Sequence, residues 1–472
     1  MNISKVLKLS AVACATVLTS GCSSIAQKND YKKINEPISQ GDLATATLNA
    51  ENLAGNIEPN TGMADDLIWS LQAGTMNHIT GNDQRTIMYF DAAEKSFRDE
   101  NSEGALKNTG ETTGAVLVND AVIDYEPTNF DMVYANHYKA ISFWKMDKAS
   151  DARVEFNRAE DRQRRAAESF AEAIKEQQEL SQTKDAQQVN YGKMMDDIDA
   201  NMKASGIDMT GSEWTPYEGY INPAVTYASS LFFMLEGKSG NDYNKAVDGF
   251  ERVYGLSKNA SVKTDLEMAK SLVKGKHKDS FKPTVWIIHE DGQAPKKSEF
   301  RVDLPVFLLT GEPQVASYAI PKMDSGTPAF GSVKANDFKT GEIANISKVI
   351  NSEFKEELPA IKARAAASTI SKVVAQAAAA QMAKNDDTGA ASIVQLGTML
   401  YSLVSTSADI RTNVALPNSV GVVRMPKHDS FVLKAGTFDV PVNTDPNSNF
   451  SIVYIRTINS TTQPVVSVIN VQ

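Results

Sequence analysis

The hydrophobic periodicity of this chain changes near residues 274–283, and this change limits the folds that the chain can adopt. Before it, apolar residues recur at helical spacing between short polar breaks. After it, compact β-branched runs alternate with turn signals. The sequence therefore predicts an α+β protein, with a helical domain over residues 32–274 and a β-rich domain over residues 283–472.

The helical half contains three predicted helix pairs whose second members share a pattern. The expected pairs are 65–80 with 84–98, 132–144 with 151–159, and 223–235 with 243–255. A small residue, an aromatic and a second apolar residue recur at i, i+4 and i+7 on the second helices: Ala152, Phe156 and Ala159, then Ala246, Phe250 and Val253, with Ala93 and Phe97 giving the first half. This spacing puts the three side chains on one helix face.

The pattern resembles tetratricopeptide repeats, in which a small residue lets the second helix nest against the first. Gly74 and Gly81 match the glycine positions of that family, although the units are farther apart than its period of about 34 residues. An irregular helical bundle is the alternative. If the pairs stack as repeats, we expect an interaction groove that includes Phe97, Phe156, Phe250 and Tyr243.

A long charged helix is predicted over Arg158–Leu180. It carries a narrow stripe of Ala166, Phe170 and Ile174 among Arg, Glu, Lys and Gln. Such a helix is either a partner-binding arm or a solvated face.

The β-rich domain is expected to begin with a hairpin. Val285–His289 and Glu299–Leu309 are the two runs, joined by the turn signal Glu290-Asp291-Gly292. Further strands are predicted at Tyr318–Pro321, Val420–Met425, Ser430–Leu433, Thr437–Val442, Phe450–Ile455 and Val465–Val471. A helical insertion lies between them over about 343–405, with Pro359 breaking or kinking Ile343–Leu358 before the Ala-rich helix Ala360–Ala383, and Ser392–Ser405 as a last helix.

The N-terminus has the order of a secretory signal. Lys5 and Lys8 precede an uncharged apolar run, and Leu18-Thr19-Ser20-Gly21-Cys22 looks like a lipobox. The run is too short to span a bilayer. We expect a signal peptide over residues 1–21, cleavage between Gly21 and Cys22, and a tether over residues 22–31.

In bacterial lipoproteins, which this segment resembles, the cysteine sulfur and the new amine are acylated. That resemblance implies a lipid anchor on Cys22, and the absence of Asp beside it favours the periplasmic face of the outer membrane over the inner membrane. Cys14 leaves with the signal, so the mature chain has one cysteine and no internal disulfide. An ordinary signal peptide with an incidental cysteine is the alternative.

Composition and motifs argue against nucleic-acid binding and catalysis. The formal charge is −10, and an acidic chain gains little from binding phosphates of nucleic acid. None of His78, His137, His277, His289 and His428 falls in a metal-binding spacing, and we expect surface or capping roles for them. No GxSxG or P-loop motif occurs. We therefore expect no catalytic residues, no metal and no cofactor.

Several segments together resemble an uncharacterised family of bacterial tetratricopeptide-containing lipoproteins. They are the lipobox, Asn222-Pro223, Trp286–Gly292, Arg301–Pro305, Glu353–Pro359, Asp409-Ile410-Arg411 and Leu416-Pro417. The resemblance implies an envelope lipoprotein without naming an activity.

The sequence thus favours a lipid-anchored periplasmic scaffold that binds an envelope protein of unknown identity. A glycan- or ligand-binding module that uses Trp214, Tyr217 and Trp286, connected with cell-wall synthesis, is the first alternative. A hydrolase with Glu290 and Asp291 as its acid pair is the second.

Overall fold

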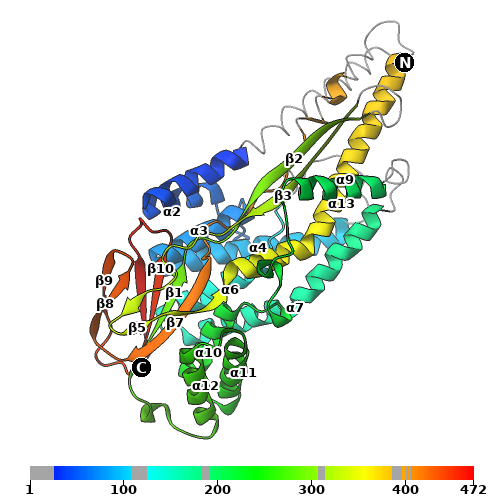
Figure 1. Ribbon diagram of the computed structural model, residues 1–472. Coiled ribbons are helices and arrows are strands. Elements are labelled where there is room, and N and C mark those ends of the chain that lie inside the picture. Colours follow the sequence, from blue (N-terminus) through cyan, green and yellow to red (C-terminus); the bar gives the residue numbers. More distant parts are fainter. Residues whose placement is uncertain are drawn as a thin grey trace.

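The computed structural model describes residues 26–107, 125–181, 191–306, 314–384, 396–399, 402–403 and 405–471 (Figure 1). Helices and strands combine in a mixed α+β fold, as the periodicity predicts. Gly21 and Cys22 lie outside the described residues, so cleavage and lipidation stay predictions. Within the described ranges, no helix is both long enough and apolar enough to cross a membrane.

The first described helix covers residues 26–40 and is fixed to the body of the protein. Tyr31 is buried, and its ring lies 4.8 Å from that of Trp69. Its hydroxyl donates to the carbonyl of Thr412 at 3.0 Å and accepts from the Thr412 N–H. The predicted tether over residues 22–31 is therefore too long, because helix begins by residue 26.

The predicted helix pairs form, and the two helices of each pair pack against each other. They are α3 (Leu67–Thr80) with α4 (Asp83–Lys107), α6 (Asn129–Lys145) with α7 (Ala149–Ser181), and α10 (Pro223–Glu236) with α11 (Gly240–Ser257). Additional helices are α2 (Leu43–Ala54), α9 (Tyr191–Ala204) and α12 (Ala260–Val273). A Cβ on Gly74 would lie 2.8 Å from the Phe90 ring, so this glycine permits close approach of α3 and α4. The tetratricopeptide character of the pairs is not confirmed.

The main sheet has the order β11-β10-β1-β7-β6 (Figure 1). Its strands are β1 (Thr284–Asp291), β6 (Gly341–Asn345), β7 (Ser419–Pro426), β10 (Phe450–Thr457) and β11 (Val465–Val471). The pair β1–β10 is parallel and the others are antiparallel. The predicted hairpin is wrong: β2 (Lys296–Val306) pairs with β3 (Gln314–Asp324) in a separate two-stranded ribbon, not with β1. The strand predicted at Tyr318–Pro321 is the middle of β3.

The main sheet is covered on both faces, which explains the continuous apolar run of β1. Val285 and Ile287 face a small sheet of order β5-β4-β8-β9. Trp286 and Ile288 belong to the core shared with the helices. The small sheet comprises β4 (Lys334–Ala335), β5 (Phe338–Lys339), β8 (Ser430–Ala435) and β9 (Phe438–Asn443).

A helical excursion leaves the main sheet after β6 and returns at β7, as the predicted insertion requires. It begins with α13 (Ile346–Lys384), which runs away from the sheet with the β2–β3 ribbon along its distal part (Figure 1). Two details differ from the prediction. Ile343 belongs to β6, and Pro359 lies inside one continuous helix. Half of the helix predicted at Ser392–Ser405 lies outside the described residues.

The boundary near residue 280 separates types of secondary structure but not hydrophobic cores. One cluster of buried side chains includes Trp69 and Phe232 from the helical half, and Trp286 and Ile452 from the main sheet. Polar contacts reinforce the junction: Asp265 of α12 accepts from Trp286 Nε1, Tyr227 Oη and Arg424 Nη1, each at 2.9 Å.

Candidate functional site

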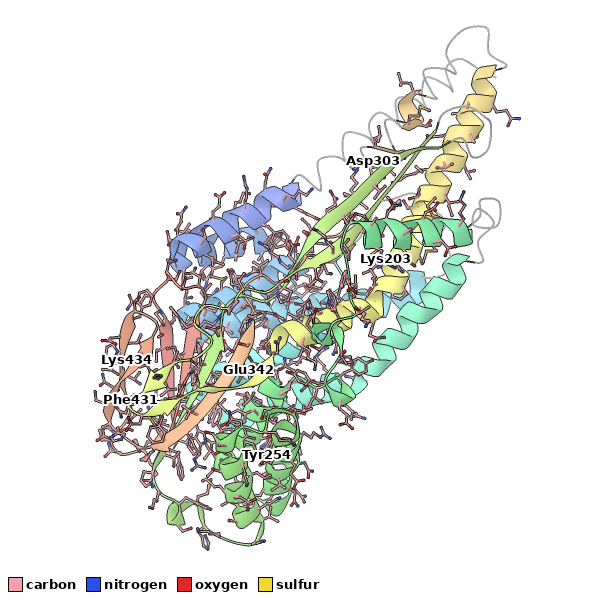
Figure 2. The ribbon with its side chains drawn as sticks, viewed as in Figure 1. Lys203, Tyr254, Asp303, Glu342, Phe431 and Lys434 are labelled. Atoms are coloured by element: carbon pink, nitrogen blue, oxygen red, sulfur yellow. The ribbon has the colours of Figure 1, made fainter. Side chains whose placement is uncertain are left out.

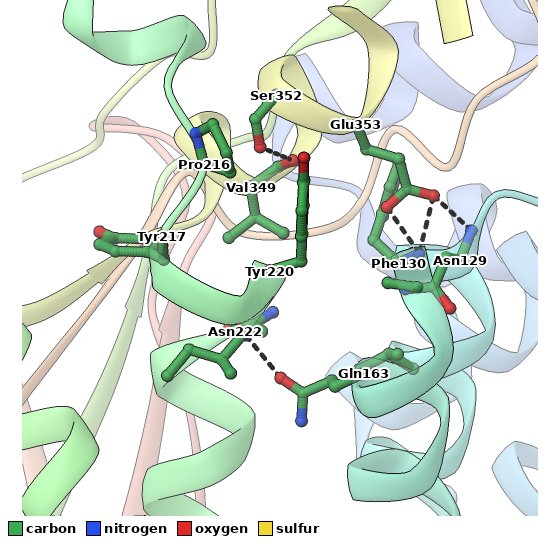
Figure 3. A pocket seen from close by; sticks show the side chains of 13 residues that line it. Asn129, Phe130, Gln163, Pro216, Tyr217, Tyr220, Asn222, Val349, Ser352 and Glu353 are labelled. Carbon is green, nitrogen blue, oxygen red and sulfur yellow. Dashed lines mark hydrogen bonds between the residues drawn. The ribbon is translucent and has the colours of Figure 1, made fainter. Parts of the chain in front are cut away.

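A recess lies where the helical half meets the start of α13 (Figure 3). It holds about 390 Å³ of unfilled space, part of it open to solvent. Its walls come from the N-termini of α6 and α10, from α7, from the turns around residues 216–221, and from α13. Asn222 and Glu353, from two segments of the family resemblance, meet here.

Glu353 forms the carboxyl wall of the recess and caps α6. It is buried, and its carboxylate accepts from the backbone N–H groups of Asn129 and Phe130, the latter at 3.2 Å (Figure 3). These groups belong to the first turn of α6, where N–H groups lack helical partners and the helix dipole favours negative charge. The α6 N-terminus is thus stabilised by a residue from the other half of the chain.

Burial raises the pKa values of the carboxyl groups at this end of the recess and beside it. It raises the pKa of Glu353 well above the ordinary value of 4.5, and the neighbouring Glu357 raises it further. Burial also raises the pKa of Asp131, although hydrogen bonds from Thr128 and Tyr125 oppose the shift. The N–H donors of Asn129 and Phe130 oppose the rise for Glu353, because hydrogen bonds to a carboxylate stabilise its charged form.

Two buried amide side chains form the opposite wall. Gln163 of α7 accepts from the backbone N–H of Asn222 through Oε1 (Figure 3). Asn222 begins α10, because its Oδ1 accepts from Ala224 N at 3.1 Å. The hydrogen bond from Asn222 identifies which end of the Gln163 amide is the oxygen. The other end, Nε2 of Gln163, has no hydrogen-bond partner among the described residues. A buried N–H without a partner costs free energy, so an acceptor from a ligand would be stabilised here.

Tyr217 and Tyr220 supply the aromatic surface. The Tyr217 hydroxyl accepts from the backbone N–H of Asn345 at 3.0 Å, and Lys348 Nζ lies 4.6 Å from the ring centroid. Tyr220 has a φ of +53°, a left-handed conformation that is unusual for a bulky residue. Backbone strain of this kind often occurs at binding sites.

One serine, Ser352, is among the residues that line the recess. Ser352 donates its hydroxyl to the carbonyl of Val349 at 2.9 Å, so it has the environment of a helix serine rather than of a nucleophile. The recess thus presents aromatic rings, an amide donor and a carboxyl group, which are groups that bind polar ligands. Among the described residues, no group of three metal-ligating side chains occurs.

The predicted repeat groove is not brought together as a surface. Phe156 and Phe250 have no exposed area and belong to the core, while Phe97 and Tyr243 are half-buried against it. The i, i+4, i+7 pattern thus reports the helix–helix interface, and the groove prediction is wrong for its two central residues.

The three aromatic residues of the ligand-binding alternative are also separated. Trp286 is fully buried and donates to Asp265. Trp214 is buried against Phe354, with ring centroids 6.5 Å apart. Only Tyr217 lines the recess.

The acid pair of the hydrolase alternative lies in the interior. Glu290 accepts from Tyr138 Oη at 3.3 Å, while Asp291 accepts from the N–H groups of Phe330 and Gly331 at 2.9 Å. Both carboxylates therefore accept hydrogen bonds from other segments within the fold. The expected surface role is also wrong for His137 and His289, which are buried.

Sequence reasoning did not single out Gln163 or Tyr220, and it named Glu353 only as the start of a segment in the family resemblance. The N-cap pair Asn222-Pro223 marked one edge of the recess, but no local signal joins residues that lie far apart in the chain. No family model, curated protein or solved structure matches this chain.

Proposed function

We propose that this protein is a lipid-anchored, non-catalytic scaffold of the bacterial cell envelope, held at the periplasmic face of the outer membrane and binding another envelope protein. One observation carries the proposal beyond the lipobox. The body is fixed to helix 26–40 through Tyr31, and four residue steps from Cys22 to Ala26 reach at most about 14 Å. A lipid on Cys22 would therefore hold the whole fold close to the bilayer.

The shape of the helical half supports a protein partner. The helix α7 has 33 residues, and buried side chains recur along it from Ala152 to Ala166. Among them, the side chains of Arg164 and Arg165 are 75% and 53% exposed. Exposed charge of this kind steers partners and sets their orientation. The partner-binding interpretation of Arg158–Leu180 is therefore retained in this proposal.

Membrane fractionation after Cys22→Ala substitution tests the anchor. The variant should lose lipid labelling and become soluble, while a Ser24→Ala variant should behave as wild type. Continued membrane association of Cys22→Ala would contradict the proposal. In-cell crosslinking followed by mass spectrometry tests the partner. Repeated experiments with wild type should recover the same envelope protein, and experiments with Cys22→Ala should recover much less of it.

Ligand binding in the recess is the second candidate, favoured by the unpartnered Gln163 amide beside two tyrosines. A thermal-shift screen with muropeptides separates it from a scaffold, which should show no shift. Tyr220→Ala should abolish such a shift, and Tyr243→Ala, outside the recess, should preserve it. A shift equal in both variants would argue against the recess.

A further inference from the structure

A second pocket lies on the distal part of α13, away from the recess. Its walls are β3, α13 and residues 405–407, and it holds about 280 Å³ of unfilled space. Two cations, Arg364 and Lys372, line it together with seven residues that carry hydroxyl groups, and none of its lining residues is Asp or Glu. This is the composition of an oxyanion site, since oxyanions bind best to cations and O–H or N–H donors.

The cations share one face of α13. Arg364, Ser368 and Lys372 are four residues apart, so their side chains project along the same side of the helix. Lys372 is only 4% exposed, and its Nζ donates to Thr406 Oγ1 at 3.0 Å and to the carbonyl of Ser405 at 3.3 Å. A lysine ammonium buried this far is costly unless charged or polar groups surround it.

An unsatisfied hydroxyl is a second, independent indication. Ser405 is 1% exposed, and its Oγ has no hydrogen-bond partner among the described residues. Thr369, in contrast, donates to the carbonyl of Ser317 at 2.8 Å and so joins α13 to β3. Since a buried hydroxyl is stabilised by a partner, an oxyanion between Ser405 and the two cations would supply an acceptor.

The pocket lies beside the place where the first helix docks. Lys28 pairs with Glu299 of β2 at 3.2 Å, and two residues along the same strand Arg301 donates to the carbonyl of Thr406, which lines the pocket. Asp303 on the same ribbon (Figure 2) is bound by Arg301 at 2.9 Å. An anchor four residues before helix 26–40 would therefore bring this side of the protein to the membrane.

We propose that this pocket binds a phosphate group through Arg364, Lys372 and the hydroxyl of Ser405. The phosphate is either the headgroup of an anionic phospholipid or free phosphate from solution. The lipid source rests on the proposed anchoring, whereas the oxyanion site itself does not.

Calorimetric titration with inorganic phosphate tests the site. The protein is the full mature chain with Cys22→Ala, which removes any contribution of the anchor, and chloride at equal ionic strength is the reference. Arg364→Gln should weaken phosphate binding about tenfold or more, because a charge-assisted donor is lost. Lys355→Gln on an exposed part of the same helix is the matched control. Ser405→Ala removes no charge and should weaken phosphate binding less than Arg364→Gln does. Because this second variant changes only a hydroxyl group, weaker binding in both variants could not be explained by misfolding of Arg364→Gln alone.

Vesicle sedimentation distinguishes the sources. Vesicles of phosphatidylcholine with and without phosphatidylglycerol are compared for the same variants. Binding that requires phosphatidylglycerol and falls in Arg364→Gln identifies the lipid headgroup, and phosphate binding without vesicle preference identifies free phosphate. If neither inorganic phosphate nor the vesicles distinguish Arg364→Gln from Lys355→Gln, the site is refuted. Fractionation of Cys22→Ala in cells tests the anchor separately.

Discussion

Two regions of the molecule bury carboxyl groups in opposite ways. Between α4, α6 and α7, Glu94 lies against Lys139, Arg162 and Arg98 at 3.1, 3.2 and 2.7 Å. In the recess, Glu353 has backbone N–H groups as its partners and acidic neighbours. Burial alone would raise both pKa values, yet the cations hold the pKa of Glu94 down to about 2, while that of Glu353 is raised.

This difference separates Glu94, a carboxylate held among cations, from Glu353, a carboxyl group held by backbone N–H groups. A carboxylate surrounded by cations stays ionised and joins helices together. Burial and like-charged neighbours raise the pKa of a carboxyl group, while backbone N–H groups that donate to it oppose that rise. The ion-pair region therefore joins helices through ionised side chains, whereas the recess holds a carboxyl group whose pKa is raised.

The largest expected effect comes from Lys139. Its ammonium is buried and lies within 3.2 Å of Asp91, Glu94 and Glu155. Lys139→Met should lower the free energy of unfolding by roughly 3–5 kcal/mol, because three carboxylates lose their central cation. Urea denaturation measures this loss. Lys95→Met, at an exposed position on α4, is the control, and equal losses in both variants would contradict the structural role.

A smaller effect is expected from acid. Because the pKa of Glu94 is lowered in the folded state, its stabilisation is present above about pH 5 and is lost as the pH falls towards 2. A shift from 4.5 to about 2 corresponds to roughly 3 kcal/mol. Glu94→Gln should be less stable than wild type at pH 7, and the difference should shrink to less than half by pH 3. A constant difference between pH 7 and pH 3 would contradict this interpretation.

Glu353 should give the smallest effect and the opposite sign. With a raised pKa, the folded protein holds a proton that the unfolded chain releases, so stability falls as the pH rises above about 4.5. Glu353→Gln keeps an acceptor and has no proton to release, so it should be at least as stable as wild type at pH 7. Above about pH 4.5, the free energy of unfolding of this variant should vary less with pH than that of wild type. If Glu353→Gln lost as much stability at pH 7 as Glu94→Gln does, Glu353 would be an ionised structural residue like Glu94, and the prediction would be wrong.

Local patterns were sufficient for much of the fold. The three helix pairs and the strands β7 to β11 follow from periodicity and turn residues, which act over a few positions. The partner of β1 could not be found this way, because a run buried on both faces pairs equally well with any apolar strand. Its neighbours are β7 and β10, more than a hundred residues away.

The candidate site was less accessible to sequence reasoning. The sequence predicted a groove that includes Phe156 and Phe250, because an aromatic residue at helical spacing does not reveal whether another helix covers it. Gln163, Asn222 and Glu353 are ordinary polar residues until tertiary packing brings α7, α10 and α13 together. Burial and missing hydrogen-bond partners, which only a structure supplies, identify them.

The excursion between β6 and β7 has an evolutionary consequence. Asn345 and Ser419 are paired neighbours in the sheet, so the chain departs and returns at adjacent points. The sheet therefore places no demand on the length of what is inserted between them, and the distal end of α13 can grow or shrink through insertions and deletions without altering strand register. Related chains would then differ most in how far this projection reaches, while the body that carries it stays the same size.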